Sequence, residues 1–104
     1  MSSDSGARPT YTGATLNDEN GQSVGKIRDV VFEGDSDRPT WLVVKTGLLK
    51  GERYVPARGL SVTGSGQVVV PYGKALIDSA PKAGKNHALG QQQRAALAAH
   101  FDLN

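Results

Sequence analysis

Residues 39–46 read Pro-Thr-Trp-Leu-Val-Val-Lys-Thr, the most strand-like segment of the chain. β-Branched and aromatic side chains dominate this stretch, and such side chains favour the pleated surface of a sheet. Alternation places Trp41 and Val43 on one side of the strand and Leu42 and Val44 on the other. Residues 39–46 therefore form the strongest predicted strand of the chain.

The segment before it, residues 23–33, is predicted to be a long strand with an irregularity. Val24 and Ile27 are three positions apart, which breaks the period of two that a regular strand requires. A bulge at Gly25 is expected to restore the register, so that Ile27 and Asp29 share one face. Both faces of the strand are partly apolar, as a closed or two-layered sheet requires.

Four shorter strands are predicted around these two. Turn signals at Asn-Asp-Glu-Asn-Gly and Gly-Ser-Gly separate them, because asparagine and glycine tolerate the backbone angles of tight turns. The predicted strands occupy residues 12–16, 52–56, 60–63 and 67–71. Six short strands at regular spacing favour a small barrel or a sandwich, and this pattern leaves the choice open.

The sequence changes character after Pro71. A short helix is predicted at about residues 73–80, and an alanine-rich helix at about residues 90–101, with Leu97 and Phe101 four positions apart on one face. Residues 1–10 are polar and are predicted to be a disordered tail. One domain is therefore expected over residues 11–104.

Composition narrows the class of protein. The 104 residues include no cysteine, which excludes disulfides and suits a reducing cytoplasm. No apolar run approaches the roughly 20 residues of a membrane span, and the polar opening lacks the apolar core of a signal peptide. We therefore expect a cytoplasmic protein.

Charge is distributed unevenly along the chain. Residues 1–37 hold three basic and seven acidic side chains, a net charge of −4, whereas residues 38–104 hold nine basic and three acidic ones, a net charge of +6. If the halves face different ways, the domain has an acidic and a basic side, which favours self-association or steering of a charged partner. Ordinary solvated charge is the alternative.

Signals for catalysis are weak. His87 and His100 are the two imidazoles, and no nucleophile motif surrounds any serine. The acidic turn at residues 33–37 lacks the pattern of a calcium loop, and the glycines form no phosphate-binding motif. The sequence therefore predicts no enzyme activity, no cofactor and no metal site.

Two sets of residues are candidates for binding instead. The first is an apolar set that could meet a protein partner: Trp41, Leu48, Leu49, Leu97 and Phe101. The second is a basic set around an aromatic ring, which could hold a nucleic-acid backbone and stack a base: Lys45, Lys50, Arg53, Tyr54 and Arg58.

Residues 21–31, 38–48, 54–56 and 68–72, together with the helix that follows Leu89, resemble the stand-alone bacterial members of the PRC-barrel domain family. The resemblance implies a six-stranded, strongly bent, mostly antiparallel β-barrel with short C-terminal helices. Related barrels occur in photosynthetic reaction-centre H subunits and in ribosome-maturation factors. In both proteins they are docking modules, and the family has no shared catalytic residues.

The expected function is therefore that of a non-enzymatic protein-interaction module that self-associates, with a homodimer as its expected form. The alternative is an RNA- or ribosome-associated module that uses the basic set. Stress tolerance, ribosome assembly and envelope biology all stay open as cellular roles.

Overall fold

The structure is a computed structural model that describes residues 11–32, 39–47, 51–83 and 89–103. Within these ranges it contains the six strands and two helices that the sequence predicts. They are β1 (Thr15–Asn17), β2 (Ser23–Val31), β3 (Trp41–Lys45), β4 (Glu52–Pro56), β5 (Ser61–Val62), β6 (Val68–Val69), α1 (Lys74–Asp78) and α2 (Gln91–His100).

The six strands form one sheet with the order β4-β3-β2-β1-β6-β5. Four of the five neighbouring pairs are antiparallel, but β1 and β6 run parallel, so the sheet is mixed. The sheet is thus mostly but not purely antiparallel, and the prediction that it closes into a barrel is wrong. Among the described residues the end strands β4 and β5 do not pair with each other: β6 pairs with β1 over two residues, and the outer edge of the two-residue strand β5 has no neighbouring strand.

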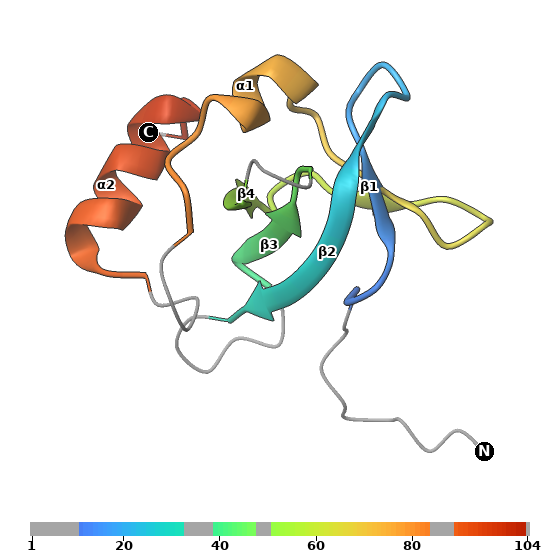
Figure 1. Cartoon of the computed structure of the whole chain (residues 1–104), viewed down its shortest axis with the longest axis horizontal. Coiled ribbons are helices and arrows are strands. Elements are labelled where there is room, and N and C mark those ends of the chain that lie inside the picture. The colour runs from blue at the N-terminus through green and yellow to red at the C-terminus, as the bar shows by residue number, and fades with distance from the viewer. Residues whose placement is uncertain (1–10, 33–38, 48–50, 84–88, 104) are drawn as a thin grey trace.

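Strand β2 bends strongly across the sheet (Figure 1). Its ladders skip one residue at each of two places: Val24 has no partner on β1, and Arg28 has none on β3. The predicted bulge at Gly25 is thus displaced by one residue. Because of the second bulge, Ile27 pairs with Val44 and Asp29 with its neighbour Val43, so Ile27 and Asp29 lie on opposite faces and not on one face as expected.

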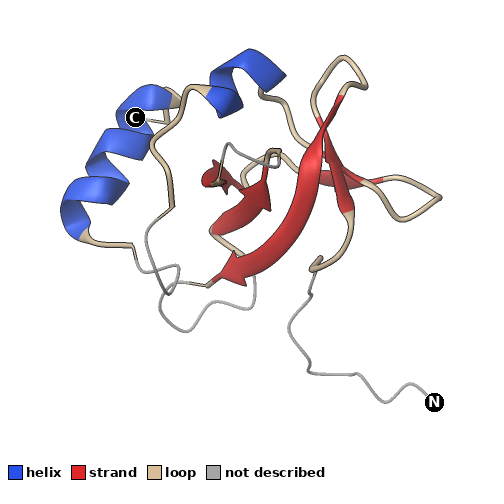
Figure 2. Ribbon diagram, in the orientation of Figure 1, coloured by secondary structure: helices blue, strands red, loops and turns tan. Residues whose placement is uncertain are grey.

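The core lies where the bent sheet meets the helices. Residues 41–44 of β3 are all buried, so this central strand is covered on both faces. Figure 2 shows both helices gathered at one end of the sheet, away from the hairpin that projects at the other end. Helix α1 contributes Ile77 to the core, and helix α2 contributes Leu97. Phe101, the residue directly after α2, is buried in the same core.

Helix α2 ends in a Schellman motif. The Leu103 N–H donates to the Ala98 carbonyl over 2.8 Å, and the Asp102 N–H donates to the Ala99 carbonyl over 3.3 Å. Asp102 sits at the left-handed position of this motif, with φ at 57°, where glycine is the usual residue.

Asp102→Gly is expected to stabilise the fold, because glycine adopts this φ without the steric strain of a Cβ. The gain is about 0.5 kcal/mol, which corresponds to a Tm about 2–4 °C higher in thermal unfolding. Asp102→Ala keeps the Cβ and serves as the control, for which no gain is expected. An equal change in both variants would contradict the strain at Asp102.

Candidate interaction surfaces

The apolar residues predicted to form a protein interface lie in the core where the structure describes them. Trp41, Leu97 and Phe101 are all buried. The Phe101 ring packs edge-on against Tyr72 with 5.2 Å between ring centroids, so it attaches α2 to the segment after β6. Leu48 and Leu49 lie outside the described residues. The three described side chains therefore hold the domain together and present no surface to a partner.

The predicted basic set is dispersed by the fold. Tyr54 is only 1% exposed, so its ring has no free face on which a base could stack. Arg53 is also buried, and its Nε donates to the Asp78 carbonyl at the end of α1 over 3.3 Å. Arg58 is exposed elsewhere, where Nη1 donates to the Leu103 carbonyl over 3.4 Å. Lys50 lies outside the described residues, and Lys45 alone joins a cationic cluster.

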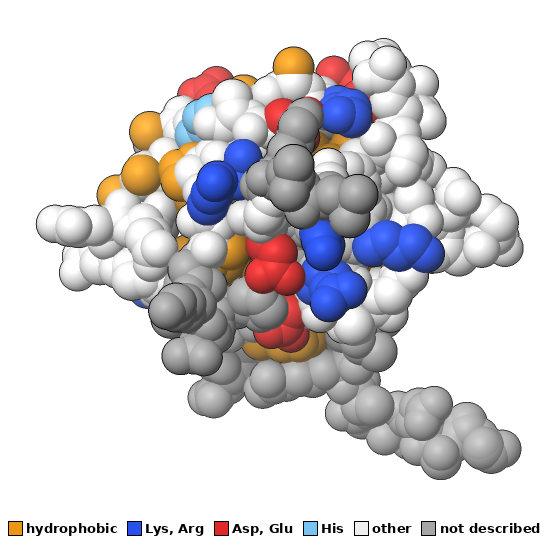
Figure 3. Space-filling view, viewed as in Figure 1, with side chains coloured by type: hydrophobic (Ala, Val, Ile, Leu, Met, Phe, Trp, Pro, Cys, Tyr) orange, Lys and Arg blue, Asp and Glu red, His pale blue; other side chains and the backbone are white. Residues whose placement is uncertain are grey.

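That cluster, the basic surface, consists of Lys26, Arg28 and Lys45. Lys26 and Lys45 are direct cross-strand partners on β2 and β3, and the bulge turns Arg28 outward beside them. All three side chains are exposed. Figure 3 shows blue side chains gathered over this part of the sheet, with red carboxylates beside them.

Two carboxylates border the basic surface. Glu52 on β4 is the cross-strand partner of Lys45 on β3, and its Oε2 lies 3.9 Å from Arg28 Nε. Asp29 lies on the same face of β2 as Lys26, because their partners on β3, Val43 and Lys45, are two positions apart. Its Oδ1 accepts a hydrogen bond from the Val30 N–H over 2.8 Å. The basic surface therefore keeps a net positive charge.

Two shallow depressions open on the basic surface. One, of about 260 Å³, is lined by Gly25, Lys26, Arg28, Lys45, Thr46 and Gly47. The other, of about 330 Å³, is lined by Thr12, Gly13, Lys26, Ile27 and Arg28. They share Lys26 and Arg28, and no carboxylate belongs to either lining in the described part of the chain.

Sequence reasoning missed Lys26 and Arg28, because along the chain they belong to the acidic half. Only the pairing of β2 with β3 brings them next to Lys45. The alternation in residues 23–33 signalled an irregularity, but not that it would present Arg28 on the surface.

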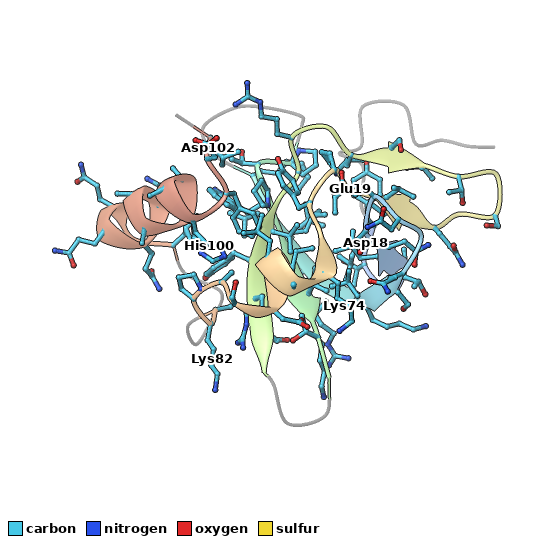
Figure 4. The ribbon with its side chains drawn as sticks, turned by 90° about the horizontal axis from the view of Figure 1, so that it is seen from above. Asp18, Glu19, Lys74, Lys82, His100 and Asp102 are labelled. Carbon is cyan, nitrogen blue, oxygen red and sulfur yellow. The ribbon has the colours of Figure 1, made fainter. Side chains whose placement is uncertain are left out.

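Asp18 is a second residue whose role the sequence did not indicate. Its carboxylate is 1% exposed and accepts three backbone hydrogen bonds. Oδ1 accepts from the N–H groups of Asn20 (2.9 Å) and Gln22 (2.8 Å), and Oδ2 accepts from Lys74 N–H (3.1 Å). Figure 4 shows Asp18 between the β1–β2 turn and α1. One side chain thus ties the turn to the start of the helix.

These bonds control the acidity of the Asp18 carboxyl group. Burial acts to raise its pKa, because it penalises the charged form. The three N–H donors and the charge of Lys74 outweigh burial, so the pKa lies below its usual value of 3.8.

Ser79 and His100 lie close together without forming a catalytic dyad. His100 Nε2 is 2.7 Å from the Leu76 carbonyl oxygen and 3.3 Å from Ser79 Oγ. A carbonyl oxygen only accepts, so Nε2 carries the hydrogen and cannot take a proton from the serine. Ser79 Oγ in turn donates to the same carbonyl over 3.0 Å. The other predicted imidazole, His87, lies outside the described residues.

The described ranges hold neither a cluster of metal-ligating side chains nor a membrane-spanning helix. No three His, Asp or Glu side chains come together there in a way that could hold a metal ion. No helix in these ranges has the length and apolar character to cross a membrane.

The outer edge of β5, which we call the open edge, is the last candidate surface. In the described structure no strand pairs with it. Val62 on this edge is 52% exposed, and residues 59–73 contain no charged side chain. The opposite end of the sheet is partly covered, since the Ala83 N–H donates to the Glu52 carbonyl on β4 over 2.7 Å.

Comparison with known proteins identifies the family. The family model for the PRC-barrel domain matches residues 10–79, which is more than half of the chain and includes all six strands. No curated protein matches the chain. PRC-barrel domains in general are non-catalytic and mediate protein interactions. The chain belongs to the PRC-barrel domain family.

Proposed function

We propose that this chain is a non-catalytic protein-interaction module that pairs with a second copy of itself through the open edge. The observation that carries the proposal is an exposed, uncharged edge at β5, which carries Val62, the most exposed large apolar side chain among the described residues. Strand addition at such an edge is a common mode of protein recognition.

The hydrogen-bond pattern of the hairpin supports pairing at this edge. The Thr63 N–H donates to the Gln67 carbonyl over 2.8 Å, so Thr63 and Gln67 are a hydrogen-bonded pair of the hairpin. Ser61 and Val69, two positions further along, are the next pair of this kind, and Val62 lies between the two pairs. Antiparallel ladders alternate between residues that bond inward and residues that point outward. The N–H and C=O of Val62 therefore point away from β6 and can bond to another strand.

The composition of the edge supports the same proposal. Proteins usually protect an edge strand with charged side chains or proline. No such residue interrupts positions 59–70, and the short length of β5 is its main protection. A second copy offers an identical edge, so antiparallel pairing across a twofold axis would match Val62 with its counterpart.

Light scattering after size exclusion tests the proposal. Wild type is expected to elute at twice the chain mass, whereas Val62→Lys places a charge on the open edge and raises the dimer dissociation constant at least about tenfold. Leu76→Lys is the matched control, because Leu76 is the other exposed large apolar residue described and lies on α1. A monomeric wild type, or equal effects of both variants, would exclude the open edge as a dimer interface.

The proposal treats residues 11–104 as one cytoplasmic domain that includes α2. Although α2 lies beyond the family match, the burial of Leu97 and Phe101 in the same core supports including it. The lack of cysteine supports the cytoplasm.

An RNA- or ribosome-associated module is the second candidate, and the basic surface is the observation that favours it. With Tyr54 buried, binding would depend on phosphate contacts with Lys26, Arg28 and Lys45. Three such contacts predict that the logarithm of the affinity for a single-stranded oligonucleotide falls with the logarithm of salt with a slope of about −2. Absence of binding at low salt would remove this candidate.

A further inference from the structure

We propose that the basic surface binds an acidic protein segment, with Lys26, Arg28 and Lys45 contacting its carboxylates. The proposal rests on the protein-interaction function and names the chemistry of a partner at a site separate from the open edge. Charge complementarity decides the occupant: the two depressions of this surface are lined by cations and by no described carboxylate.

The arrangement of the cations does not serve the fold. Lys26 and Lys45 face each other directly across two strands, and like charges at such positions destabilise a sheet. Glu52 is shared between Lys45, its cross-strand neighbour, and Arg28, its 3.9 Å ion-pair partner. A carboxylate from a partner would relieve the remaining repulsion, so binding accounts for this pair where folding does not.

The ion pair between Arg28 and Glu52 is the kind of arginine–carboxylate contact that we propose for the partner. Arg28 holds a carboxylate at the border of the surface while 57% of its own side chain stays exposed. A guanidinium has five N–H groups, so the same side chain can hold a second carboxylate beside Glu52.

The shape of the surface favours an extended acidic segment over nucleic acid. The two depressions lie on either side of β2, one toward Lys45 on β3 and the other toward Thr12 and Gly13, and both are lined by Lys26 and Arg28. Carboxylates on one side of an extended peptide are spaced by about 7 Å, which matches the spacing of alternate residues on a strand. Bases of a nucleic acid would need an aromatic platform, and Tyr54, the aromatic residue of the predicted basic set, is buried.

A peptide titration tests the proposal. The ¹⁵N-labelled chain is titrated with a five-residue peptide of alternating glutamate and valine, with the glutamine counterpart of that peptide and with an oligouridine. We expect the glutamate peptide to shift the amide signals of residues 25–28 and 45–47, and the glutamine peptide to leave them in place. Lys26→Gln with Lys45→Gln should weaken glutamate-peptide binding at least about tenfold.

The matched control is Arg58→Gln with Arg94→Gln, which removes the same charge from exposed positions outside the basic surface and should change binding less than about twofold. Equal losses in the two double variants, equal binding of both peptides, or tighter binding of oligouridine would each overturn the proposal. All titrations are repeated in Val62→Lys. Because that change acts on the open edge alone, failure of self-association and failure of acidic-segment binding are read out separately.

Discussion

Gly25→Ala is expected to lower the free energy of unfolding by about 3 kcal/mol, which corresponds to a Tm lower by about 12–20 °C. A Cβ at this position would collide with the backbone carbonyl of Lys45 and press on the Cα of Thr46. Both obstacles are backbone atoms of the neighbouring strand, so no side-chain rotation can relieve the collision. The β2–β3 ladder would have to separate where it supports the basic surface.

Gly64→Ala is the matched control for this change. Gly64 lies in the turn between β5 and β6, and a Cβ there meets nothing within 4 Å. Thermal unfolding of the two variants side by side should show a large loss for Gly25 and a Tm change within about 2 °C for Gly64. Similar losses would mean that the strands tolerate separation at Gly25.

Asp18→Asn is expected to give the second large loss, with Tm lower by about 5–10 °C. The substitution removes the charge and places an amide N–H₂ where one of the carboxylate oxygens accepted a hydrogen bond. The new amide N–H₂ then faces a backbone N–H, either that of Lys74 or that of Gln22 in the turn, and neither group can accept a hydrogen bond. Glu19→Gln is the control, since the exposed neighbouring carboxylate makes no such bonds in the described structure, and its Tm should not change measurably.

The same comparison at different pH values tests the cause. The folded-state pKa of Asp18 is lowered below 3.8, so its stabilising contribution is fully present above that value and is lost as pH falls through the folded-state pKa. The Tm difference between wild type and Asp18→Asn should therefore stay constant from about pH 7 to pH 5 and shrink below about pH 4. A difference that persists unchanged at lower pH would show that the charge of Asp18 is not the cause.

The sequence predicted every helix and strand that the structure describes, because each is marked by local chemistry. Alternation and turn residues located β4 at residues 52–56, as the structure has it, and placed α2 within one residue at each end. The arrangement of the sheet was not predictable in this way. Parallel pairing of β1 with β6 depends on contacts between distant segments, and no local pattern indicates that the sheet stays open.

The candidate surfaces were less predictable than the fold. An apolar residue such as Trp41 or Leu97 has the same local pattern whether it faces a core or a partner, and the structure buries both. The basic surface could not be predicted because no segment of the chain contains all of its residues. Its members come from two strands, and their proximity depends on a bulge at Arg28 that alternation alone does not locate.

The parallel contact between β1 and β6 also governs how the molecule is made. It joins Leu16 to Val68 and Asn17 to Val69, pairs that are about fifty positions apart, whereas β1 to β4 follow one another as simple antiparallel neighbours. During synthesis the four-strand meander can assemble first, but the free side of β1 stays uncovered until residue 69 has left the ribosome. Closing so long a loop for two ladder pairs is the step we expect to limit the folding rate.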